Sequence, residues 1–286
     1  MKLRQAILDA ERAIAALGSD EARLEAELIL GCALHLDRVH LYQHLEEEIG
    51  SAPYGRFRRL LDRRLANEPT AYILGHKEFF GLDFDVSPVA LIPRPETETL
   101  VDLVIAFARE RFGNSPVTIA DIGCGCGIIA VSLAHALPFA QLIATDINPD
   151  ALELTSRNAL RHDVGGRIKL ALGDLLAPVQ EPVDIIAANL PYVPTADWEN
   201  LPPEIRDHEP RSGLDGGPDG LRLIVRLLEQ AAPHIRPAGA LFEEIGYEHG
   251  KLATHEARRL FPEAAIAVEK DMTGRDRILV VKTLGS

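Results

Sequence analysis

The sequence predicts an α/β protein in which a mainly parallel sheet of seven strands follows a small N-terminal helical bundle. Three observations support this prediction. Apolar residues recur at helical spacing through residues 1–75, aromatic and β-branched residues alternate with Gly, Asp and Pro through residues 79–95, and strand-like runs alternate with helical segments after that point. Strands separated by helices are typical of an α/β domain with a parallel sheet.

The helical prediction for residues 1–75 depends on periodicity. Leu24 and Leu28 lie four residues apart, and the helical pattern stops at residues 50–53 before a further helix begins. That helix contains five arginines within nine residues: Arg56, Arg58, Arg59, Arg63 and Arg64. Such a run is a candidate docking surface, although it is usually a solvated helix face.

Two further regions follow the helical domain. Residues 76–95 are expected to form a β-hairpin and a linker, because turn residues interrupt short runs of aromatic and β-branched residues. Residues 96–286 are expected to form the larger domain. Its strands are predicted at residues 117–120, 142–144, 168–172, 183–188, 240–245, 265–268 and 278–281.

Charge and cysteine content restrict the partners of the chain. The formal net charge of −13 over 286 residues argues against direct binding to nucleic acid, because phosphate contacts need clustered Lys and Arg. Three cysteines, an odd number, argue against a disulfide framework and favour a reducing compartment. We therefore expect a cytoplasmic monomer that binds neither nucleic acid nor membrane directly.

One apolar stretch, residues 122–145, is long enough to cross a bilayer and contains no Asp, Glu, Lys or Arg. It also contains three glycines near its start, His135 and Pro138. We interpret it as a loop, a buried helix and a strand.

A glycine-rich turn lies between the strand at residues 117–120 and the apolar helix at residues 128–137. Glycines permit a tight bend and a close approach of backbone N–H groups to a ligand, which the N-terminus of the helix can also meet. Asp146 ends the next strand, where a carboxylate can hold the hydroxyl pair of a ribose. The expected cofactor-binding residues here are Asp121, Gly123, Cys124, Gly125, Cys126, Gly127 and Asp146.

Two kinds of cofactor fit this turn. Residues 125–130 satisfy the G-x-G-x-x-A form of the dinucleotide-binding pattern. Asp121 favours the other kind, because a carboxylate beside the turn suits a zwitterionic amino acid moiety and repels a pyrophosphate. The turn alone leaves both open.

Two neighbouring segments extend the expected cofactor site. Asn148 and Pro149 provide an N-cap and an N1 proline, so a helix is expected to begin directly after Asp146. Asp174 and Leu175 follow the third strand, where Asp174 is a candidate acceptor for the exocyclic amine of an adenine.

The acceptor site is predicted at Asn189, Leu190, Pro191 and Tyr192, which follow a buried strand and so lie at the carboxyl edge of the sheet. An amide nitrogen is a poor nucleophile unless its N–H groups are held. The Asn189 side-chain oxygen and the Leu190 carbonyl can accept those two hydrogens, and Tyr192 offers a flat face. Pro191 biases Leu190 towards an extended conformation. Asn189 is also expected to contact the cofactor.

Several motifs resemble known families. The glycine turn with Asp146 resembles the class I methyltransferase signature, and residues 189–192 resemble the N-P-P-Y motif of enzymes that methylate amide or exocyclic nitrogens. More of the chain is similar to the PrmC/HemK family, the release factor glutamine methyltransferases. The matching segments are residues 68–75, 78–81, 91–98, 209–210, 216–217, 219–221 and 244–246, with Asp271, Gly274 and Arg277.

The resemblance implies a Rossmann-like catalytic domain that uses S-adenosyl-L-methionine to methylate the side-chain nitrogen of a glutamine. That glutamine belongs to the Gly-Gly-Gln tripeptide of bacterial class I peptide chain release factors. Asn189, Pro191 and Tyr192 would hold it, the residues from Gly123 to Gly127 and Asp146 would hold the cofactor, and the N-terminal domain would help to dock the release factor.

Leu190 departs from the family pattern, which has proline at this position. The resulting N-L-P-Y form also occurs in rRNA adenine dimethyltransferases, so an rRNA adenine methyltransferase is one alternative. A methyltransferase for a ribosomal-protein glutamine is a second, an NAD-dependent oxidoreductase a third, and a non-catalytic docking protein a fourth.

No metal is expected. His40 and His44 lie four residues apart, but they lack the H-E-x-x-H pattern and a third ligand. Cys124 and Cys126 form a lone C-x-C inside the glycine turn, where small side chains that tolerate the turn explain them, and Cys32 is expected in the core.

Overall fold

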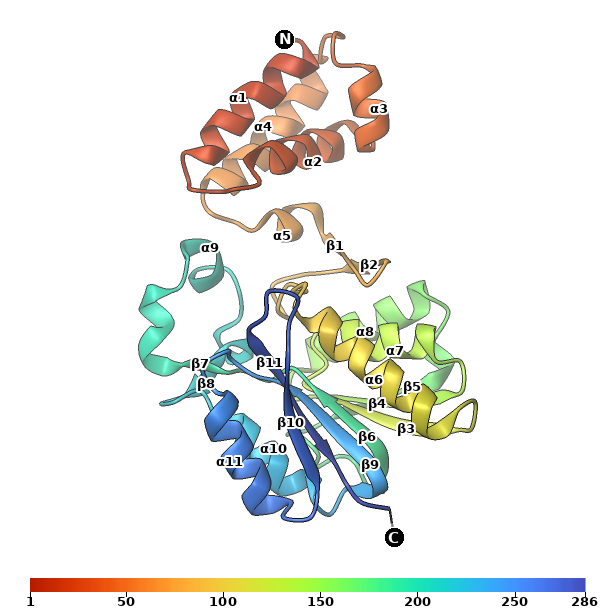
Figure 1. Ribbon diagram of the computed structural model, residues 1–286. Helices are drawn as coiled ribbons and strands as arrows, with labels where there is room; N and C mark the ends of the chain where they lie inside the picture. Colours follow the sequence, from red (N-terminus) through yellow and green to blue (C-terminus); the bar gives the residue numbers. More distant parts are fainter. Residues whose placement is uncertain (286) are drawn as a thin grey trace. The chain divides into compact units, whose positions relative to one another are not determined.

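A computed structural model describes residues 1–285, which form two compact units (Figure 1). The helical unit comprises Met1–His76 together with Pro202–His208. The sheet unit comprises Lys77–Leu201 and the chain from Glu209 onward. Each unit is described by itself below.

The helical unit has an apolar core between amphipathic helices. The core joins α1 (Leu3–Ala15), α2 (Ala22–Leu34) and α4 (Ser51–Leu65), and α3 (Arg38–Gln43) and α5 (Thr70–Leu74) complete this part of the chain. Ile7, Ile29 and Phe57 are among the buried residues where these helices meet. The helical periodicity of the sequence therefore corresponds to faces that pack together.

A short segment from far along the chain belongs to the helical unit. Residues 202–208 include α9 (Pro203–Arg206). Arg64 of α4, which is buried, donates to Glu204 at 3.0 Å and also to Glu25 of α2. A ring nitrogen of His208 lies 3.2 Å from the Ala66 carbonyl oxygen. Sequence periodicity does not predict this association, because its contacts join residues more than a hundred positions apart.

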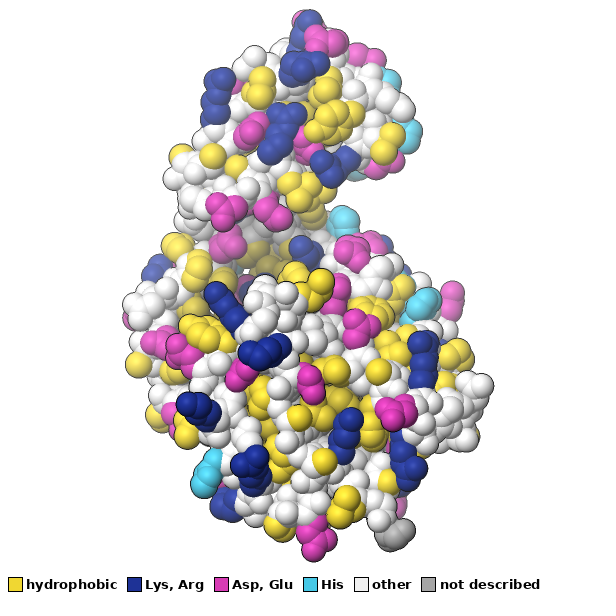
Figure 2. Space-filling view, viewed as in Figure 1, with side chains coloured by type: hydrophobic (Ala, Val, Ile, Leu, Met, Phe, Trp, Pro, Cys, Tyr) yellow, Lys and Arg dark blue, Asp and Glu magenta, His cyan; other side chains and the backbone are white. Residues whose placement is uncertain are grey.

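The arginines of α4 are largely engaged within the helical unit. Arg56 donates to the Ala33 carbonyl oxygen, Arg58 lies 3.5 Å from Asp62, and Arg63 binds Glu68. Together with buried Arg64, four of the five arginines thus have partners in their own unit. These contacts favour a structural role for the run. Basic and acidic side chains also lie interspersed on the face shown in Figure 2.

The sheet unit contains the predicted seven-stranded sheet, in the order β10-β11-β9-β6-β3-β4-β5. The strands are β3 (Val117–Ile122), β4 (Ala140–Asp146), β5 (Ile168–Leu172), β6 (Val183–Ala188), β9 (Ile235–Glu244), β10 (Ala265–Lys270) and β11 (Asp276–Lys282). The central strands pair in parallel, and β11 is antiparallel to both of its neighbours. The prediction of a mainly parallel α/β sheet is confirmed.

Helices cover both faces of the sheet (Figure 1). One face packs against α6 (Thr97–Phe112), α7 (Ile128–Ala136) and α8 (Pro149–Arg161), and the other against α10 (Arg222–Ala231) and α11 (Gly250–Leu260). The apolar stretch at residues 122–145 forms a loop, α7 and β4, as expected. Within residues 1–285, no helix has the length and apolar character needed to span a membrane.

Short elements connect these layers. A hairpin of β1 (His76–Phe79) and β2 (Leu82–Asp85) turns at Phe80 and Gly81, which both have positive φ. Strands β7 (Val193–Pro194) and β8 (Asp215–Gly217) pair outside the main sheet. Single 3₁₀ turns lie at η1 (Gly165–Arg167), η2 (Thr195–Asn200) and η3 (Arg211–Gly213).

Glu243 is a buried carboxyl group in the apolar layer between the sheet and helices α10 and α11. It is 0% exposed, and within the described residues neither of its carboxyl oxygens has a hydrogen-bond partner. Leu241 and Ile245, two positions away on either side, belong to the same apolar layer. Burial raises the pKa of Glu243 well above its usual value, so the folded protein favours the neutral acid.

We expect Glu243→Met to stabilise the protein by about 1–3 kcal/mol at neutral pH, the usual cost of a buried polar group without a partner. The unfolded chain loses the Glu243 proton above about pH 4.3, whereas the folded protein keeps it, so wild-type stability falls as pH rises through this range. The gain in the variant should therefore shrink in acid. Thermal unfolding of both proteins across pH measures it, and an unchanged or lower melting temperature at neutral pH contradicts the prediction.

Candidate active site

A cavity of about 170 Å³ lies in the sheet unit, at the carboxyl ends of the parallel strands. It is far larger than the roughly 10–15 Å³ that a water molecule occupies on this measure. Strand β3 lies between β4 and β6, so the order of the strands reverses here, which is where open α/β sheets bind ligands. The expected site residues that line the cavity are Gly123, Cys124, Gly125, Cys126, Asp146, Asp174, Leu175, Asn189, Leu190 and Pro191.

The glycine turn has the backbone conformation that its sequence requires. The backbone N–H groups of Gly123 and Cys124 both donate to the Thr145 carbonyl oxygen at 2.9 Å, which ties the turn to the end of β4. Gly127 precedes α7 with a φ of +87°, and a Cβ there would lie 2.8 Å from Cγ2 of Thr155. Residues other than glycine are therefore excluded at Gly127 both by conformation and by space.

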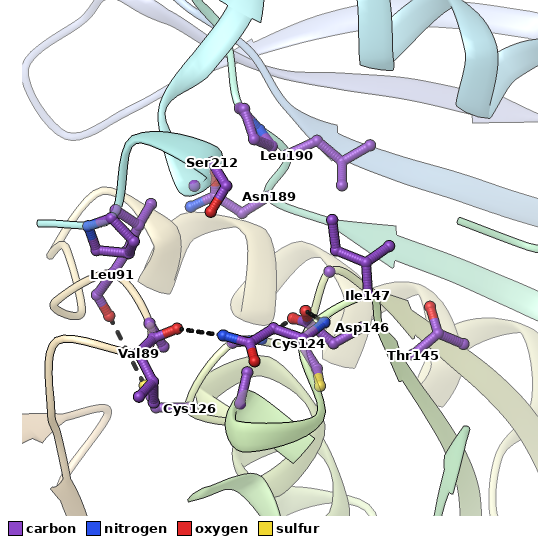
Figure 3. Close-up of a pocket in the computed structure, with 18 of the residues that line it drawn as sticks. Val89, Leu91, Cys124, Cys126, Thr145, Asp146, Ile147, Asn189, Leu190 and Ser212 are labelled. Atoms are coloured by element: carbon purple, nitrogen blue, oxygen red, sulfur yellow. Dashed lines mark hydrogen bonds between the residues drawn. The ribbon is translucent and has the colours of Figure 1, made fainter. Parts of the chain in front are cut away.

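Asp146 lies at the edge of the cavity, at the end of β4 (Figure 3). Its carboxylate accepts from the backbone N–H of Gly125 at 2.9 Å and from that of Asn148 at 2.8 Å. These two bonds fix the carboxylate and leave part of its acceptor capacity for a ligand. The Asn148 side chain caps α8 by accepting from the Asp150 N–H, so the predicted helix start is confirmed.

Asp121 lies at the end of β3 and is 0% exposed. One carboxyl oxygen accepts from the backbone N–H of Ala130 in α7 at 3.0 Å, and the other has no hydrogen-bond partner within the described residues. Burial, together with the charge of Asp146, raises the pKa of Asp121 to about 7. Asp121 and Gly127 do not line the cavity, so they lie behind the turn rather than at its surface.

Asp174 and Leu175 follow β5 and line the cavity. The Asp174 carboxylate also forms an ion pair with Arg226 of α10 at 2.5 Å. Leu175 is buried and has a φ of +52°.

The acceptor motif follows β6, beside the glycine turn. Ile122 of β3 pairs with Ala188 of β6, so the next residues, Gly123 and Asn189, leave the sheet side by side. A Cβ on Gly123 would lie 2.9 Å from the Leu190 side chain, so glycine is needed for this close approach. Asn189, Leu190 and Pro191 line the cavity, whereas Tyr192 lies beside it.

Hydrogen bonds connect the acceptor motif to two buried residues. The Asn189 Nδ2 atom donates to Oγ1 of Thr97 at 3.0 Å, and the Thr97 hydroxyl donates to Oε2 of Glu244 at 2.7 Å. The Tyr192 hydroxyl donates to Oε1 of Glu244 at 3.1 Å. Burial and the Glu244 charge raise the pKa of Tyr192, which therefore remains a donor.

A segment that sequence reasoning assigned to a linker also forms a wall of the cavity. Val89, Ala90, Leu91, Ile92 and Arg94 line it, and Figure 3 shows Val89 and Leu91 beside the glycine turn. Buried Glu209 holds this segment by accepting from the Ile92 N–H at 3.1 Å and from Arg94. The family resemblance of residues 91–98 and 209–210 was the available signal, but it carried no role for these side chains.

Histidine and cysteine side chains have ordinary structural roles. His40 pairs with Asp37 and His44 with Glu47. Within residues 1–285, no group of three or more His, Cys, Asp or Glu side chains is arranged to hold a metal ion. Cys124 and Cys126 are buried and free, and burial raises the pKa of Cys126 to about 12, so neither is an activated thiolate.

The sheet order, the glycine turn and the acceptor motif after β6 define a class I methyltransferase. Two solved structures share this fold. The hMettl16 catalytic domain is 16% identical with a TM-score of 0.58, covering 79% of this chain and 82% of that one. A methyltransferase from Pyrococcus furiosus is 20% identical with a TM-score of 0.52, covering 79% of this chain and 98% of that one.

Sequence comparison identifies the particular family. The PrmC N-terminal domain model matches residues 5–75, and the methyltransferase small domain model matches residues 103–200. Release factor glutamine methyltransferases from Moorella thermoacetica and Geobacter sulfurreducens are 46% and 44% identical to this chain. The first alignment covers 97% of both proteins, and the second covers 82% of this chain and 80% of the relative. This chain belongs to the release factor glutamine methyltransferase family, and it is an enzyme.

Proposed function

We propose that this enzyme transfers a methyl group from S-adenosyl-L-methionine to the side-chain amide nitrogen of the glutamine in the Gly-Gly-Gln motif of bacterial class I peptide chain release factors. The observation that carries the proposal is the orientation of Asn189. Its Nδ2 atom is occupied by Thr97, so its oxygen is available to accept a hydrogen bond in the cavity. The family membership supports the choice of substrate.

The residues of the cavity fit the proposed cofactor. Asp146 retains acceptor capacity for the two hydroxyls of a ribose, and Asp174 is a candidate acceptor for an adenine amine. The unpartnered oxygen of Asp121 adds negative potential behind the glycine turn, which suits a positively charged ligand and opposes a pyrophosphate. When bound, S-adenosyl-L-methionine supplies a methyl group on a positively charged sulfur, which makes that carbon electrophilic.

The acceptor residues provide binding and orientation for the substrate amide. In our proposal the Asn189 side-chain oxygen and the Leu190 carbonyl oxygen accept the two N–H groups, which fixes the nitrogen in one place. These oxygens also stabilise the positive charge that develops on nitrogen as it forms its new bond to carbon. Tyr192 limits the position of the amide plane through its ring. This step requires neither a metal ion nor a covalent nucleophile from the chain.

The leucine at position 190 is compatible with this scheme. Its carbonyl is retained, and Pro191 restricts it to an extended conformation. The Leu190 side chain is buried against Gly123, which holds the backbone of the motif next to the glycine turn. This packing replaces part of the rigidity that a proline would provide.

We further propose that residues 1–75 form a docking domain for the release factor, and that the enzyme works in the cytoplasm as a monomer. Arg59 and the exposed Val39 and Tyr42 are candidate contacts, because they lie on the surface of the helical unit. The remaining arginines of α4 are less suitable, since they are bound within that unit.

The test is to incubate the enzyme with methyl-labelled S-adenosyl-L-methionine and a release factor, and to locate the label by mass spectrometry. We expect one methyl group on the glutamine nitrogen, and none on a release factor with alanine in place of that glutamine. Ribosomal proteins and rRNA serve as competing substrates in the same assay. Label on either of these, with none on the release factor, contradicts the proposal, as does binding of NAD instead of S-adenosyl-L-methionine.

A further inference from the structure

The hydrogen bonds behind the acceptor motif have a fixed direction. Thr97 is the first residue of α6 and Glu244 is the last residue of β9, and their exposed fractions are 0% and 1%. A threonine hydroxyl has one proton to donate. Because an ionised carboxylate can only accept, the Thr97 proton points to Glu244, and Thr97 can then only accept from Asn189.

This direction determines which end of the Asn189 amide faces the cavity. With Thr97 acting as an acceptor, the amide must turn its NH₂ group to Thr97 and its oxygen to the cavity. If Glu244 instead carried a proton, it could donate to Thr97, and Thr97 could donate to the Asn189 oxygen. The Asn189 NH₂ group would then face the N–H groups of the substrate amide, and two donors cannot bond to each other.

We propose that Glu244 and Thr97 are positioning residues for methyl transfer, which hold the Asn189 oxygen towards the acceptor nitrogen. The inference rests on the proposed function. Glu244 also receives the Tyr192 hydroxyl, so one carboxylate orients both side chains of the acceptor motif that have polar groups. Neither Glu244 nor Thr97 lines the cavity, so both act through Asn189 and Tyr192.

The surroundings of Glu244 support this role. Arg277 of β11, Tyr192 after β6, Thr97 of α6 and the charge of Glu96 all act on it. Burial raises the pKa of Glu244, and Thr97, Arg277 and Tyr192 oppose that rise. Arg277 is held by Asp271, whose pKa the Thr273 hydroxyl helps to lower to about 2, so this ion pair keeps its charge in mild acid. Of the groups named, the carboxyls of Glu244 and Glu96 are therefore those that change charge there.

The first test compares three variants in their kcat and KM for a release factor at saturating cofactor. Glu244→Gln has one acceptor oxygen for two donating hydroxyls, and Thr97→Val removes the hydroxyl at constant shape. We expect kcat to fall about 10- to 100-fold in both, the scale on which a misplaced reacting group slows a reaction, with KM changed less. Thr97→Ser, which keeps the hydroxyl, should recover most of the kcat lost in Thr97→Val.

The chain offers a matched control at Glu243, which is equally buried on the neighbouring position of β9 but faces the opposite layer. Glu243→Gln should leave kcat unchanged. Wild-type kcat should decrease as pH falls through the pKa of Glu244, because protonation permits the reversed hydrogen-bond direction. That acid limb should weaken in Glu244→Gln and persist in Glu96→Gln.

The outcomes separate the two proposals. If the wild-type enzyme places no methyl on the release factor glutamine, the proposed function fails. If it does so, but Glu244→Gln and Thr97→Val retain wild-type kcat or the acid limb of Glu244→Gln equals that of wild type, the positioning inference is overturned. An equal loss of kcat in Glu243→Gln also overturns it, because general damage to β9 would then explain the effect. Circular dichroism and cofactor affinity establish that each variant is folded.

Discussion

Asn189→Ala is expected to lose most of its turnover while it still binds S-adenosyl-L-methionine. The variant lacks the oxygen that accepts one N–H of the substrate amide, so the nitrogen is less well held and its developing charge is less stabilised. Removal of one preorganised hydrogen-bonding group of this kind typically lowers kcat by about 10²–10³-fold. Single-turnover methyl transfer to a release factor, with the cofactor affinity measured by calorimetry, provides both quantities.

A suitable control for this variant is Asn200→Ala, which changes an exposed asparagine at the end of η2. It should retain the activity of the wild-type enzyme. The cofactor dissociation constant of Asn189→Ala should change by less than about tenfold, which corresponds to 1.4 kcal/mol. Wild-type turnover in Asn189→Ala would overturn the proposed acceptor site, and a loss confined to cofactor affinity would reassign Asn189 to the cofactor alone.

Asp146→Ala is expected to weaken cofactor binding about 100-fold or more. The proposed hydrogen bonds from the ribose hydroxyls end on a charged acceptor, and each such bond contributes about 1.5–3 kcal/mol. The variant also leaves the backbone N–H groups of Gly125 and Asn148 without their acceptor, which loosens the glycine turn. Calorimetric titration with S-adenosyl-L-methionine measures the dissociation constant, and the KM for the cofactor should rise in parallel.

Two comparisons sharpen the Asp146 result. Asp146→Asn keeps one carbonyl oxygen and should lie between the wild type and Asp146→Ala in affinity. Asp150→Ala, at an exposed position in the first turn of α8, should bind the cofactor as the wild type does. Asp146 has no role in holding the ribose if a folded Asp146→Ala binds the cofactor within threefold of the wild-type affinity.

The fold was accessible from the sequence because its strands are short apolar runs between clear helix signals. All seven strands lie where the runs predict them, but β9 begins at Ile235, five residues before the predicted start. Arg236, Pro237 and Gly239 look like a turn in sequence, and Ala238 has a φ of +60°. The structure resolves this as an irregular start of the strand, where the pairing of β6 with β9 shifts its register. Local propensity cannot predict an irregularity that depends on the partner strand.

The candidate site was predicted only where its residues follow strands. Strand ends meet at one edge of a sheet, so Gly123, Asp146 and Asn189 were expected together, and the structure brings them to one cavity. Thr97 and Glu244 were not predicted as site residues, because 147 positions separate them and nothing local marks them as partners. Asp121 was expected at the ligand surface but lies behind the turn. Whether it affects the cofactor through its charge stays a prediction.

The membership of residues 202–208 in the helical unit has a consequence for the history of this chain. The polypeptide passes between the two units three times, after His76, after Leu201 and after His208. A gene fusion that attached only an N-terminal segment would therefore deliver an incomplete domain, without the seven residues that bind buried Arg64 and Ala66. The domain and its distant insert must be inherited together, and a single proteolytic cut near residue 76 would not yield two self-sufficient fragments.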